Sequence, residues 1–265
     1  MILLLIIIND LKFQTMRKTV LVTGALSGIG YELAMIYAKE GFNLILVDKE
    51  LDELLKMSAM LKSLYRVSTE VINIDMTKQE SHNNLYSRFQ NLNSVIDHLI
   101  NNSLKTDIYD SLIGFDESVI QNNVIGLMKF TKLVARDMYR RGKGKIMNIA
   151  STLTDDHKNL KPLHFAMKAF VMSYTESLSY NLNGKGINVK AFCPGPSNMQ
   201  KNIENESYKN NELFNNNRTV KEVADYAFNI MKKNNSLAID GSYNNILADS
   251  VKILNKQKEM VDLLY

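Results

Sequence analysis

Cysteine is nearly absent from the sequence, and neither sign of charge is in large excess. The single cysteine, Cys193, excludes an intramolecular disulfide, and no spacing of Cys and His resembles a zinc site. The 32 basic and 28 acidic side chains leave a net charge of +4, which is too balanced for disorder and too weak a field to indicate a nucleic-acid partner. With 45% hydrophobic residues in 265, the composition predicts a reduced, cytoplasmic, globular protein without a metal.

The sequence also has no apolar run of the length that crosses a membrane. The longest run at the start, residues 2–8, is far shorter than the roughly 20 residues that span a bilayer. It has neither a basic region before it nor a small-residue cleavage site after it, as a secretory signal would. We therefore expect no stable membrane insertion, although a weak interfacial anchor stays open. Residues 1–15 are interpreted as an extension, and residues 16–265 as the domain.

From residue 19 onward, short β-branched runs alternate with amphipathic stretches. This alternation is typical of a parallel sheet covered by helices on both faces, and right-handed crossovers then give a doubly wound α/β sheet of the Rossmann type. No break in the pattern marks a second domain. The expected strands are 19–22, 43–47, 71–74, 95–100, 145–149, 187–192 and 237–239; the expected helices are 30–40, 51–64, 78–92, 116–141, 162–182 and 220–233, with a loop over 196–217.

The segment between the first strand and the first helix is rich in glycine, with the sequence TGALSGIG over residues 23–30. Glycines there allow a tight turn, let the backbone approach a pyrophosphate and let the helix pack on the strand. The start of the helix offers free N–H groups and the positive end of its dipole to that anion. The candidate cofactor-binding residues in this turn are Thr23, Gly24, Ser27, Gly28, Ile29 and Gly30.

An acidic residue closes the second strand, as expected of a dinucleotide-binding fold. Asp48 follows Gly24 by 24 residues, close to the spacing of the carboxylate that bonds the ribose 2′-hydroxyl of NAD. The same carboxylate would repel a 2′-phosphate, which favours NAD. Lys49 beside it could offset this repulsion, so NADP stays open.

The spacing TGxxxGIG resembles the short-chain dehydrogenase/reductase family, and the resemblance extends from about Arg17 to Gly241. It implies a fold that binds NAD(P), a small-molecule carbonyl or alcohol as substrate, and a homodimer or homotetramer built on the helices at 116–141 and 162–182. Apolar residues of these helices, Met128, Phe130, Met138, Phe170, Met172 and Tyr174, are compatible with such an interface or with internal packing. The resemblance also implies that Asp75, Met76, Asn101, Pro194 and Gly195 belong to the cofactor site, and that Asn123 and Ser151 belong to a catalytic tetrad.

The sequence departs from the family at the position of the catalytic tyrosine. Thirteen residues after Ser151 the family places the tyrosine of YxxxK, and here that position is His164, with Lys168 in register four residues later. In the family the tyrosine exchanges a proton with the substrate oxygen. The lysine lowers the tyrosine's pKa and holds the nicotinamide ribose. Leu104 and Met199 also replace residues that the family has near the cofactor.

These substitutions leave two hypotheses. Histidine is a competent acid and base, and positive neighbours should keep the imidazole of His164 neutral, so that it can accept a proton from an alcohol. The first hypothesis is therefore an oxidoreductase that transfers a hydride between NAD(P) and a carbonyl or secondary alcohol through Asn123, Ser151, His164 and Lys168. The second is a catalytically inactive protein that binds NAD(H) and acts as a sensor or scaffold.

Overall fold

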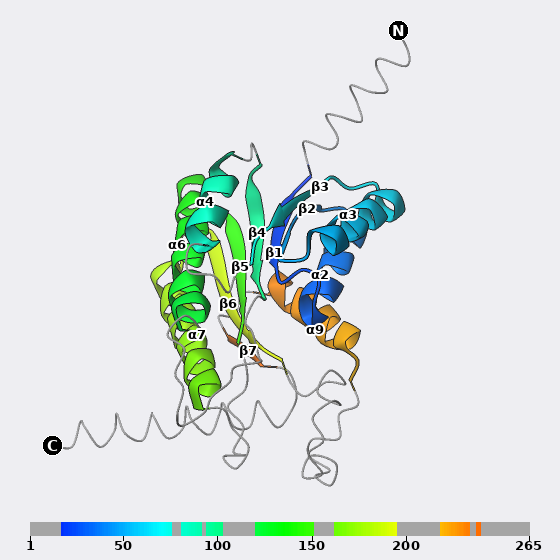
Figure 1. The fold of residues 1–265 in the computed structure, drawn as a ribbon. Helices are drawn as coiled ribbons and strands as arrows, with labels where there is room; N and C mark the ends of the chain where they lie inside the picture. Colours follow the sequence, from blue (N-terminus) through cyan, green and yellow to red (C-terminus); the bar gives the residue numbers. More distant parts are fainter. Residues whose placement is uncertain are drawn as a thin grey trace, which may run out of the picture.

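Seven parallel strands form the centre of the molecule, in the order β3-β2-β1-β4-β5-β6-β7 (Figure 1). The computed structural model describes residues 17–75, 81–91, 94–102, 120–150, 162–194, 218–233 and 237–239. The strands are β1 (Thr19–Thr23), β2 (Asn43–Asp48), β3 (Thr69–Asn73), β4 (Ile96–Asn101), β5 (Gly144–Ile149), β6 (Ile187–Cys193) and β7 (Leu237–Ile239).

The direction of strand addition reverses beside β1. The chain builds β2 and β3 on one side of β1, then returns to place β4 on its other side and continues to β7. Val20 accordingly pairs with Leu44 of β2 and with His98 of β4. In open parallel sheets, ligands bind outside the carboxyl ends of the strands at such a reversal, so the fold itself points to this end of β1 and β4.

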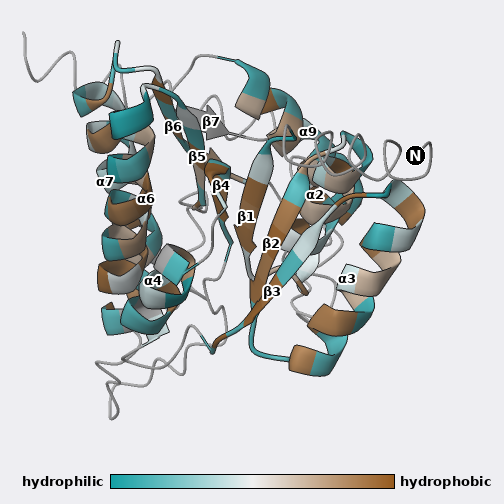
Figure 2. Ribbon diagram, turned by 90° about the horizontal axis from the view of Figure 1, so that it is seen from above, coloured by the Kyte–Doolittle hydropathy of each residue, from teal (hydrophilic) through white to brown (hydrophobic). Residues whose placement is uncertain are grey.

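Helices cover both faces of the sheet (Figures 1 and 2). One layer contains α2 (Gly28–Lys39), α3 (Leu51–Tyr65) and α9 (Val220–Lys232), and the other contains α4 (Ser81–Asn91), α6 (Leu127–Arg141) and α7 (Pro162–Asn181). The predicted doubly wound α/β fold is confirmed.

Alternate side chains along each strand pack into two hydrophobic cores, one on each face of the sheet. In β1, Val20 and Val22 pack in the core below α2 and α9, while Leu21 packs in the core below α4 and α6. All three side chains are completely buried, which explains why the strand is a continuous apolar run rather than an alternating one. Burial of each such side chain contributes about 1.5–3 kcal/mol.

The expected helix over 116–141 is not uniform. Residues 116–119 lie outside the described residues, and a π-helical turn, η1 (Gln121–Gly126), leads directly into α6. Such turns are uncommon and frequently mark functional positions, and η1 contains the candidate Asn123. The third strand also begins at Thr69, two residues before the expected start, because Thr69 already pairs with Leu44 of β2.

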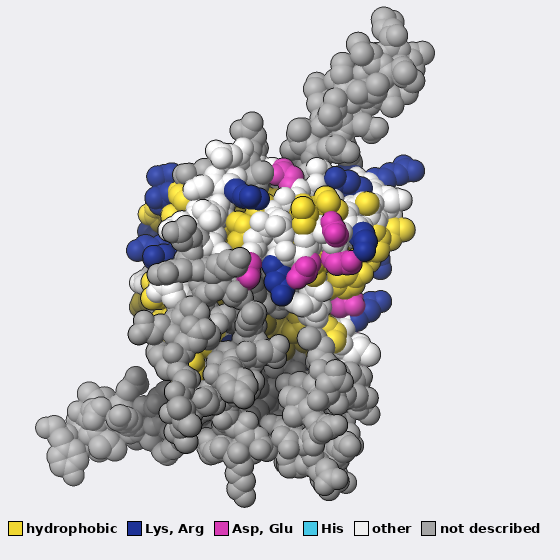
Figure 3. Space-filling model, viewed as in Figure 1, with side chains coloured by type: hydrophobic (Ala, Val, Ile, Leu, Met, Phe, Trp, Pro, Cys, Tyr) yellow, Lys and Arg dark blue, Asp and Glu magenta, His cyan; other side chains and the backbone are white. Residues whose placement is uncertain are grey.

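The outer surface of α6 is cationic rather than apolar. Phe130 and Met138, which could have belonged to an interface, are buried in the core at 1% and 0% exposure. Its exposed side chains include Lys129, Lys132, Arg136 and Arg140, and Lys and Arg side chains stand on this flank in Figure 3. No helix in the ranges given above has both the length and the apolar character to cross a membrane.

Candidate active site

The glycine-rich turn after β1 is folded tightly against the start of α2. Gly24 and Gly28 have φ angles of +62° and +48°, a region that side chains with a Cβ rarely enter. At Gly30 a side chain is excluded by steric overlap, since a Cβ would lie 2.2 Å from the Gly24 carbonyl oxygen. The three glycines are therefore needed for the backbone path of the turn, as the sequence predicted.

Asn102 ties this turn to the end of β4. Its Nδ2 donates to the carbonyl oxygens of Gly24 at 3.1 Å and Ser27 at 3.4 Å, and its backbone N–H donates to Thr23 Oγ1 at 3.1 Å. The Thr23 hydroxyl in turn lies 3.5 Å from the Ile100 carbonyl oxygen. Asn102 was not among the predicted site residues. Its position directly after a buried strand at the reversal point was the signal for it.

The start of α2 has the properties of an anion site. Ser27 is the N-cap residue, and its side chain makes no capping hydrogen bond to the helix. No acceptor in the described part of the chain takes the backbone N–H groups of Gly28 and Ile29. These amides and the helix dipole favour a negative group at this point. The turn therefore fits the pyrophosphate of a dinucleotide.

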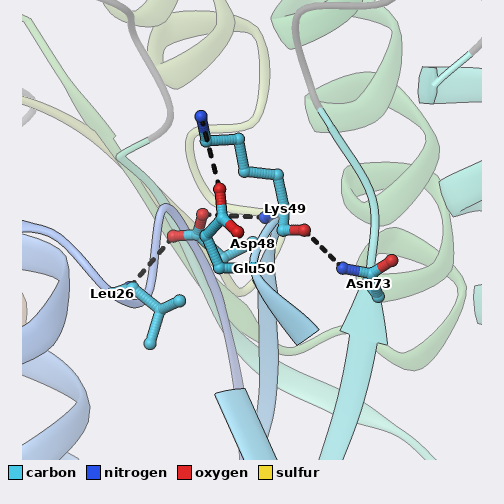
Figure 4. A network of polar contacts seen from close by, with 5 residues as sticks. All are labelled: Leu26, Asp48, Lys49, Glu50 and Asn73. Carbon is cyan, nitrogen blue, oxygen red and sulfur yellow. Dashed lines mark hydrogen bonds and ion pairs between the residues drawn. The ribbon is translucent and has the colours of Figure 1, made fainter. Parts of the chain in front are cut away.

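The carboxylate of Asp48 lies beside the turn at the end of β2 (Figure 4). It accepts hydrogen bonds from the backbone N–H of Leu26 at 3.0 Å and of Lys49 at 2.8 Å. The Lys49 ammonium is 3.5 Å from a carboxylate oxygen of Glu50, and Asn73 donates to the Lys49 carbonyl oxygen at 2.6 Å. Lys49 thus forms its ion pair with Glu50, and Asp48 keeps its negative charge next to the turn.

A buried network of polar side chains joins β4 and β5 to the helices behind them. Asn101 Nδ2 donates to Asn148 Oδ1 at 2.8 Å and to Thr131 Oγ1 at 3.0 Å, and Asn148 Nδ2 donates to Thr175 Oγ1 at 2.9 Å. None of these side chains is more than 4% exposed. Asn101, predicted as a cofactor residue, therefore uses its side chain inside the protein. The spacing of these four residues in the sequence did not indicate that they would form a network.

Lys168 is buried at the carboxyl end of β5. Its Nζ lies 3.4 Å from the carbonyl oxygen of Ile149, the last residue of that strand, and the residue is 6% exposed. Burial lowers the pKa of this ammonium to about 8, an effect that the neighbouring Cys193 partly opposes. Burial raises the pKa of the Cys193 thiol to about 12 even though Lys168 is near, so this thiol is protonated at neutral pH.

The remaining predicted residues are described in part. His164 lies in the first turn of α7, four residues before Lys168, and its side chain is outside the described part. Asn123 is 7% exposed in η1, and Asp75 and Pro194 are half-buried at the ends of β3 and β6. The predictions for Met76, Leu104, Ser151, Gly195, Met199, the loop at 196–217 and the extension at 1–15 lie outside the described residues.

The carboxyl edge of the sheet thus brings together a glycine turn, an acidic residue at the end of β2, an asparagine that bonds the turn after β4, and a buried lysine beside β5. The family model described as short chain dehydrogenase matches residues 18–209. The chain therefore belongs to the short-chain dehydrogenase family, as its resemblance implied.

Curated relatives match about two thirds of the chain. It is 28% identical over 186 residues to 17-beta-hydroxysteroid dehydrogenase type 3 of Rattus norvegicus, covering 68% of this chain and 60% of that protein. It is 29% identical over 182 residues to ketoacyl reductase HetN of Nostoc sp., covering 67% and 63%. It is 28% identical over 193 residues to very-long-chain 3-oxoacyl-CoA reductase-B of Danio rerio, covering 70% and 61%. The chain spans less than two thirds of the length of these relatives.

A solved structure has the same arrangement over nearly the whole chain. The short-chain dehydrogenase of Sphingobium yanoikuyae in complex with NADPH superposes with a TM-score of 0.79 at 25% identity, covering 92% of this chain and 95% of that one. A bulky-bulky ketone specific alcohol dehydrogenase of Comamonas testosteroni superposes with a TM-score of 0.77 at 24% identity, covering 92% and 93%. At this identity, the similarity to the alcohol dehydrogenase shows a shared fold and nothing more.

Proposed function

We propose that the protein is an NAD(P)-dependent oxidoreductase that transfers a hydride between the nicotinamide and a carbonyl or secondary alcohol. The observation that carries this proposal is the buried Lys168 beside Ile149, on the same edge of the sheet as the glycine turn. A lysine in this place can bond the nicotinamide ribose while the turn bonds the pyrophosphate. The NADPH bound to the Sphingobium relative supports the same cofactor class for this chain.

In this proposal the dinucleotide lies along the carboxyl edge of the sheet. The amides of Gly28 and Ile29 bind the pyrophosphate, and Asp48 accepts a hydrogen bond from the adenosine ribose. Asp48 is charged and its neighbour Lys49 is paired with Glu50, so a 2′-phosphate would meet a net negative group. We therefore propose a preference for NAD over NADP. Asp75, Met76, Pro194 and Gly195 complete the cofactor site through their positions after β3 and β6.

The nicotinamide ring, when bound, supplies or accepts the hydride at the carbon of the substrate. In the oxidation of an alcohol, neutral His164 accepts the hydroxyl proton and Ser151 bonds the developing carbonyl oxygen. In the reverse direction His164 must first be protonated, because a neutral imidazole is far too weak an acid to donate its N–H proton. The cationic Lys168 disfavours that protonation. The neutral imidazole of His164 therefore serves oxidation, and reduction should weaken as the pH rises and the imidazole loses its second proton.

The proposed substrates follow the names of the relatives. Those names refer to a hydroxysteroid, to ketoacyl groups and to a 3-oxoacyl-CoA. All contain a ketone or secondary alcohol next to a large apolar group. Hydroxysteroids and 3-hydroxyacyl thioesters are therefore the first compounds to assay.

A second function is favoured by His164 itself. Histidine is shorter than tyrosine, and a displacement of about 1 Å at a reacting group can cost roughly a hundredfold in rate. A protein with this substitution can keep the complete phosphate turn and bind NAD(H) without turnover, acting as a sensor or scaffold. Both functions require dinucleotide binding, and only the first requires hydride transfer.

Calorimetric titration with NAD(H) and NADP(H), followed by thermal unfolding, tests the part that the two functions share. A dinucleotide present at 100 times its Kd stabilises the folded protein by about 2.7 kcal/mol. We expect binding with one site per chain and a matching rise in the unfolding temperature. Absence of both effects with all four dinucleotides would overturn the proposal and its alternative together.

A further inference from the structure

A cavity lies at the opposite edge of the sheet from the glycine turn. It has a volume of about 440 Å³ and is lined by residues at the starts of β1, β4, β5 and β6, among them Lys18, His98, Lys145 and Ile187. The strands that line it are five to seven residues long, so roughly 16–23 Å of sheet separates it from the glycine turn. Its volume is within the roughly 300–1,000 Å³ of ligand pockets. The proposed hydride transfer makes no use of it.

The charged groups of this cavity are predominantly cationic. Lys18 and Lys143 are exposed, and neither ammonium has an ion pair or a hydrogen bond with any residue of the described ranges. Asp97 is the one acidic lining residue. Its carboxylate accepts a hydrogen bond from the backbone N–H of Thr19 at 3.0 Å and lies 3.8 Å from Arg141 Nη1. The acid is thus already neutralised, and the lysines are not.

The third lysine is held in place by the end of a helix. Lys145 Nζ donates to the carbonyl oxygen of Met231, in the last turn of α9, at 2.6 Å. Burial lowers the pKa of Lys145, and the charges of Lys18 and Lys232 lower it further. Lys18 and Lys145 are therefore close enough to repel each other. A bound anion would relieve this repulsion.

The histidine of the cavity contributes a neutral ring. The Tyr37 hydroxyl is buried and lies 3.0 Å from His98 Nδ1. The hydroxyl has no other hydrogen-bond partner in the described part of the chain, and when it donates to Nδ1 the ring proton is on Nε2. Burial lowers the pKa of His98 to about 3, assisted by Lys145 and Lys18. The ring thus stays neutral at physiological pH, and Nε2–H is its remaining donor.

We propose that this cavity binds a phosphate-type oxyanion, free or attached to a small polar molecule, between Lys18, Lys143 and Lys145. Three ammonium groups and a neutral N–H donor suit an acceptor-only ligand of high charge. Gly184 and Gly186 line the same wall and present no side chain to the cavity. The volume exceeds that of one phosphate and leaves room for the group that carries it.

Calorimetric titration of the full-length protein with inorganic phosphate, pyrophosphate and ribose 5-phosphate tests this proposal. Hydrogen exchange with and without the same compounds locates the bound ion. The test variant is Lys18→Gln with Lys143→Gln, which removes two exposed charges that hold no described partner. The control is Lys129→Gln with Lys132→Gln, which removes the same charge from the exposed surface of α6.

We expect binding of at least one compound, with exchange protection at residues 143–145 and 184–188. The Kd should rise at least fivefold in the test variant and change less than twofold in the control. Tightest binding of ribose 5-phosphate would assign the cavity to a phosphorylated molecule, and equal binding of phosphate would assign it to the free ion. Absence of binding, equal weakening in both variants, or protection confined to residues 24–30 would overturn the proposal.

Discussion

The ammonium of Lys168 lies 3.4 Å from the carbonyl oxygen of Ile149. The contact joins the first half of α7 to the last residue of β5. Its acceptor is a backbone carbonyl, which any residue at position 149 would supply. A charged group is thereby kept at 6% exposure at the edge of the sheet where the dinucleotide is proposed to bind. Such burial disfavours the charge unless a ligand compensates for it.

The pKa of Lys168 predicts a pH dependence of stability. The folded protein releases this proton near pH 8, whereas the unfolded chain keeps it to about 10.5. Between pH 8 and 9 the unfolded state therefore binds more protons, and the free energy of unfolding rises with pH. Above pH 9 the raised pKa of Cys193 acts in the opposite sense.

Denaturant unfolding at pH 8 and pH 9 measures this rise in the wild type and in Lys168→Met. The rise should be smaller in Lys168→Met, and unchanged in Lys129→Met, which alters an exposed lysine of α6. Burial also lowers the pKa of Lys190, to about 8, and the pKa of Lys145, and these two lysines account for the part that remains. Equal slopes in wild type and Lys168→Met would show that Lys168 is not desolvated in the folded protein.

Gly30→Ala should distort the glycine turn because the added methyl group overlaps neighbouring atoms. The added Cβ would lie 2.2 Å from the Gly24 carbonyl oxygen and 2.5 Å from Asn102 Nδ2, and such overpacking costs about 1–3 kcal/mol. NADH binding should be lost with it, because the amides that follow Ser27 shift. Gly142→Ala is the control, since its Cβ meets no atom within 4 Å and only its φ of +66° is unfavourable. It should bind NADH like the wild type. Normal NADH binding by Gly30→Ala would contradict this account of the turn.

Asn148→Leu should be strongly destabilising although the leucine is similar in size. It removes one of the two acceptors of the Asn101 amide, and it removes the donor to the Thr175 hydroxyl, which keeps its own hydrogen bond to the Val171 carbonyl oxygen. Hydrogen bonds lost by buried groups cost about 1–3 kcal/mol each, so the two lost bonds predict a decrease of about 3 kcal/mol in the free energy of unfolding, measured in urea. Asn73→Leu removes an exposed hydrogen bond to Lys49 and should cost less than about 1 kcal/mol. Similar decreases in the free energy of unfolding of the two variants would show that burial does not make the Asn148 hydrogen bonds more important than the exposed one.

Asp48→Asn should weaken the discrimination between the two cofactors. The wild type is expected to bind NADH at least tenfold more tightly than NADPH, because the carboxylate repels the 2′-phosphate. The amide keeps an acceptor for the Leu26 N–H but removes the charge, and the ratio should fall to threefold or less. Glu53→Gln is the control, because it removes an exposed carboxylate of α3 that pairs with Lys56 and leaves the Lys49–Glu50 pair in place. A ratio unchanged in Asp48→Asn would show that Asp48 does not face the ribose.

The periodicity of the sequence was sufficient to predict the sheet, because strands buried on both faces are continuous apolar runs. The glycine turn could be predicted too, since Gly24 and Gly30 are required by conformation and by contact. The Asn101–Asn148 network could not, because its members are separated by 47 residues and meet only when β4 and β5 pair. The π-helical turn around Asn123 was missed for a similar reason, since its residues also fit an ordinary helix.

The proposed role of His164 is tested most directly by hydride transfer in the wild type and in His164→Tyr. Both proteins would be assayed from pH 6 to 9 with NAD(H) and NADP(H) against hydroxysteroids, 3-hydroxyacyl thioesters and the corresponding ketones. The account predicts measurable oxidation by the wild type that increases as His164 loses its proton. It also predicts reduction that declines over the same pH range. Turnover that is absent from the wild type at every pH and switched on by His164→Tyr would contradict it, and would identify the protein as a dinucleotide-binding relative without catalytic activity.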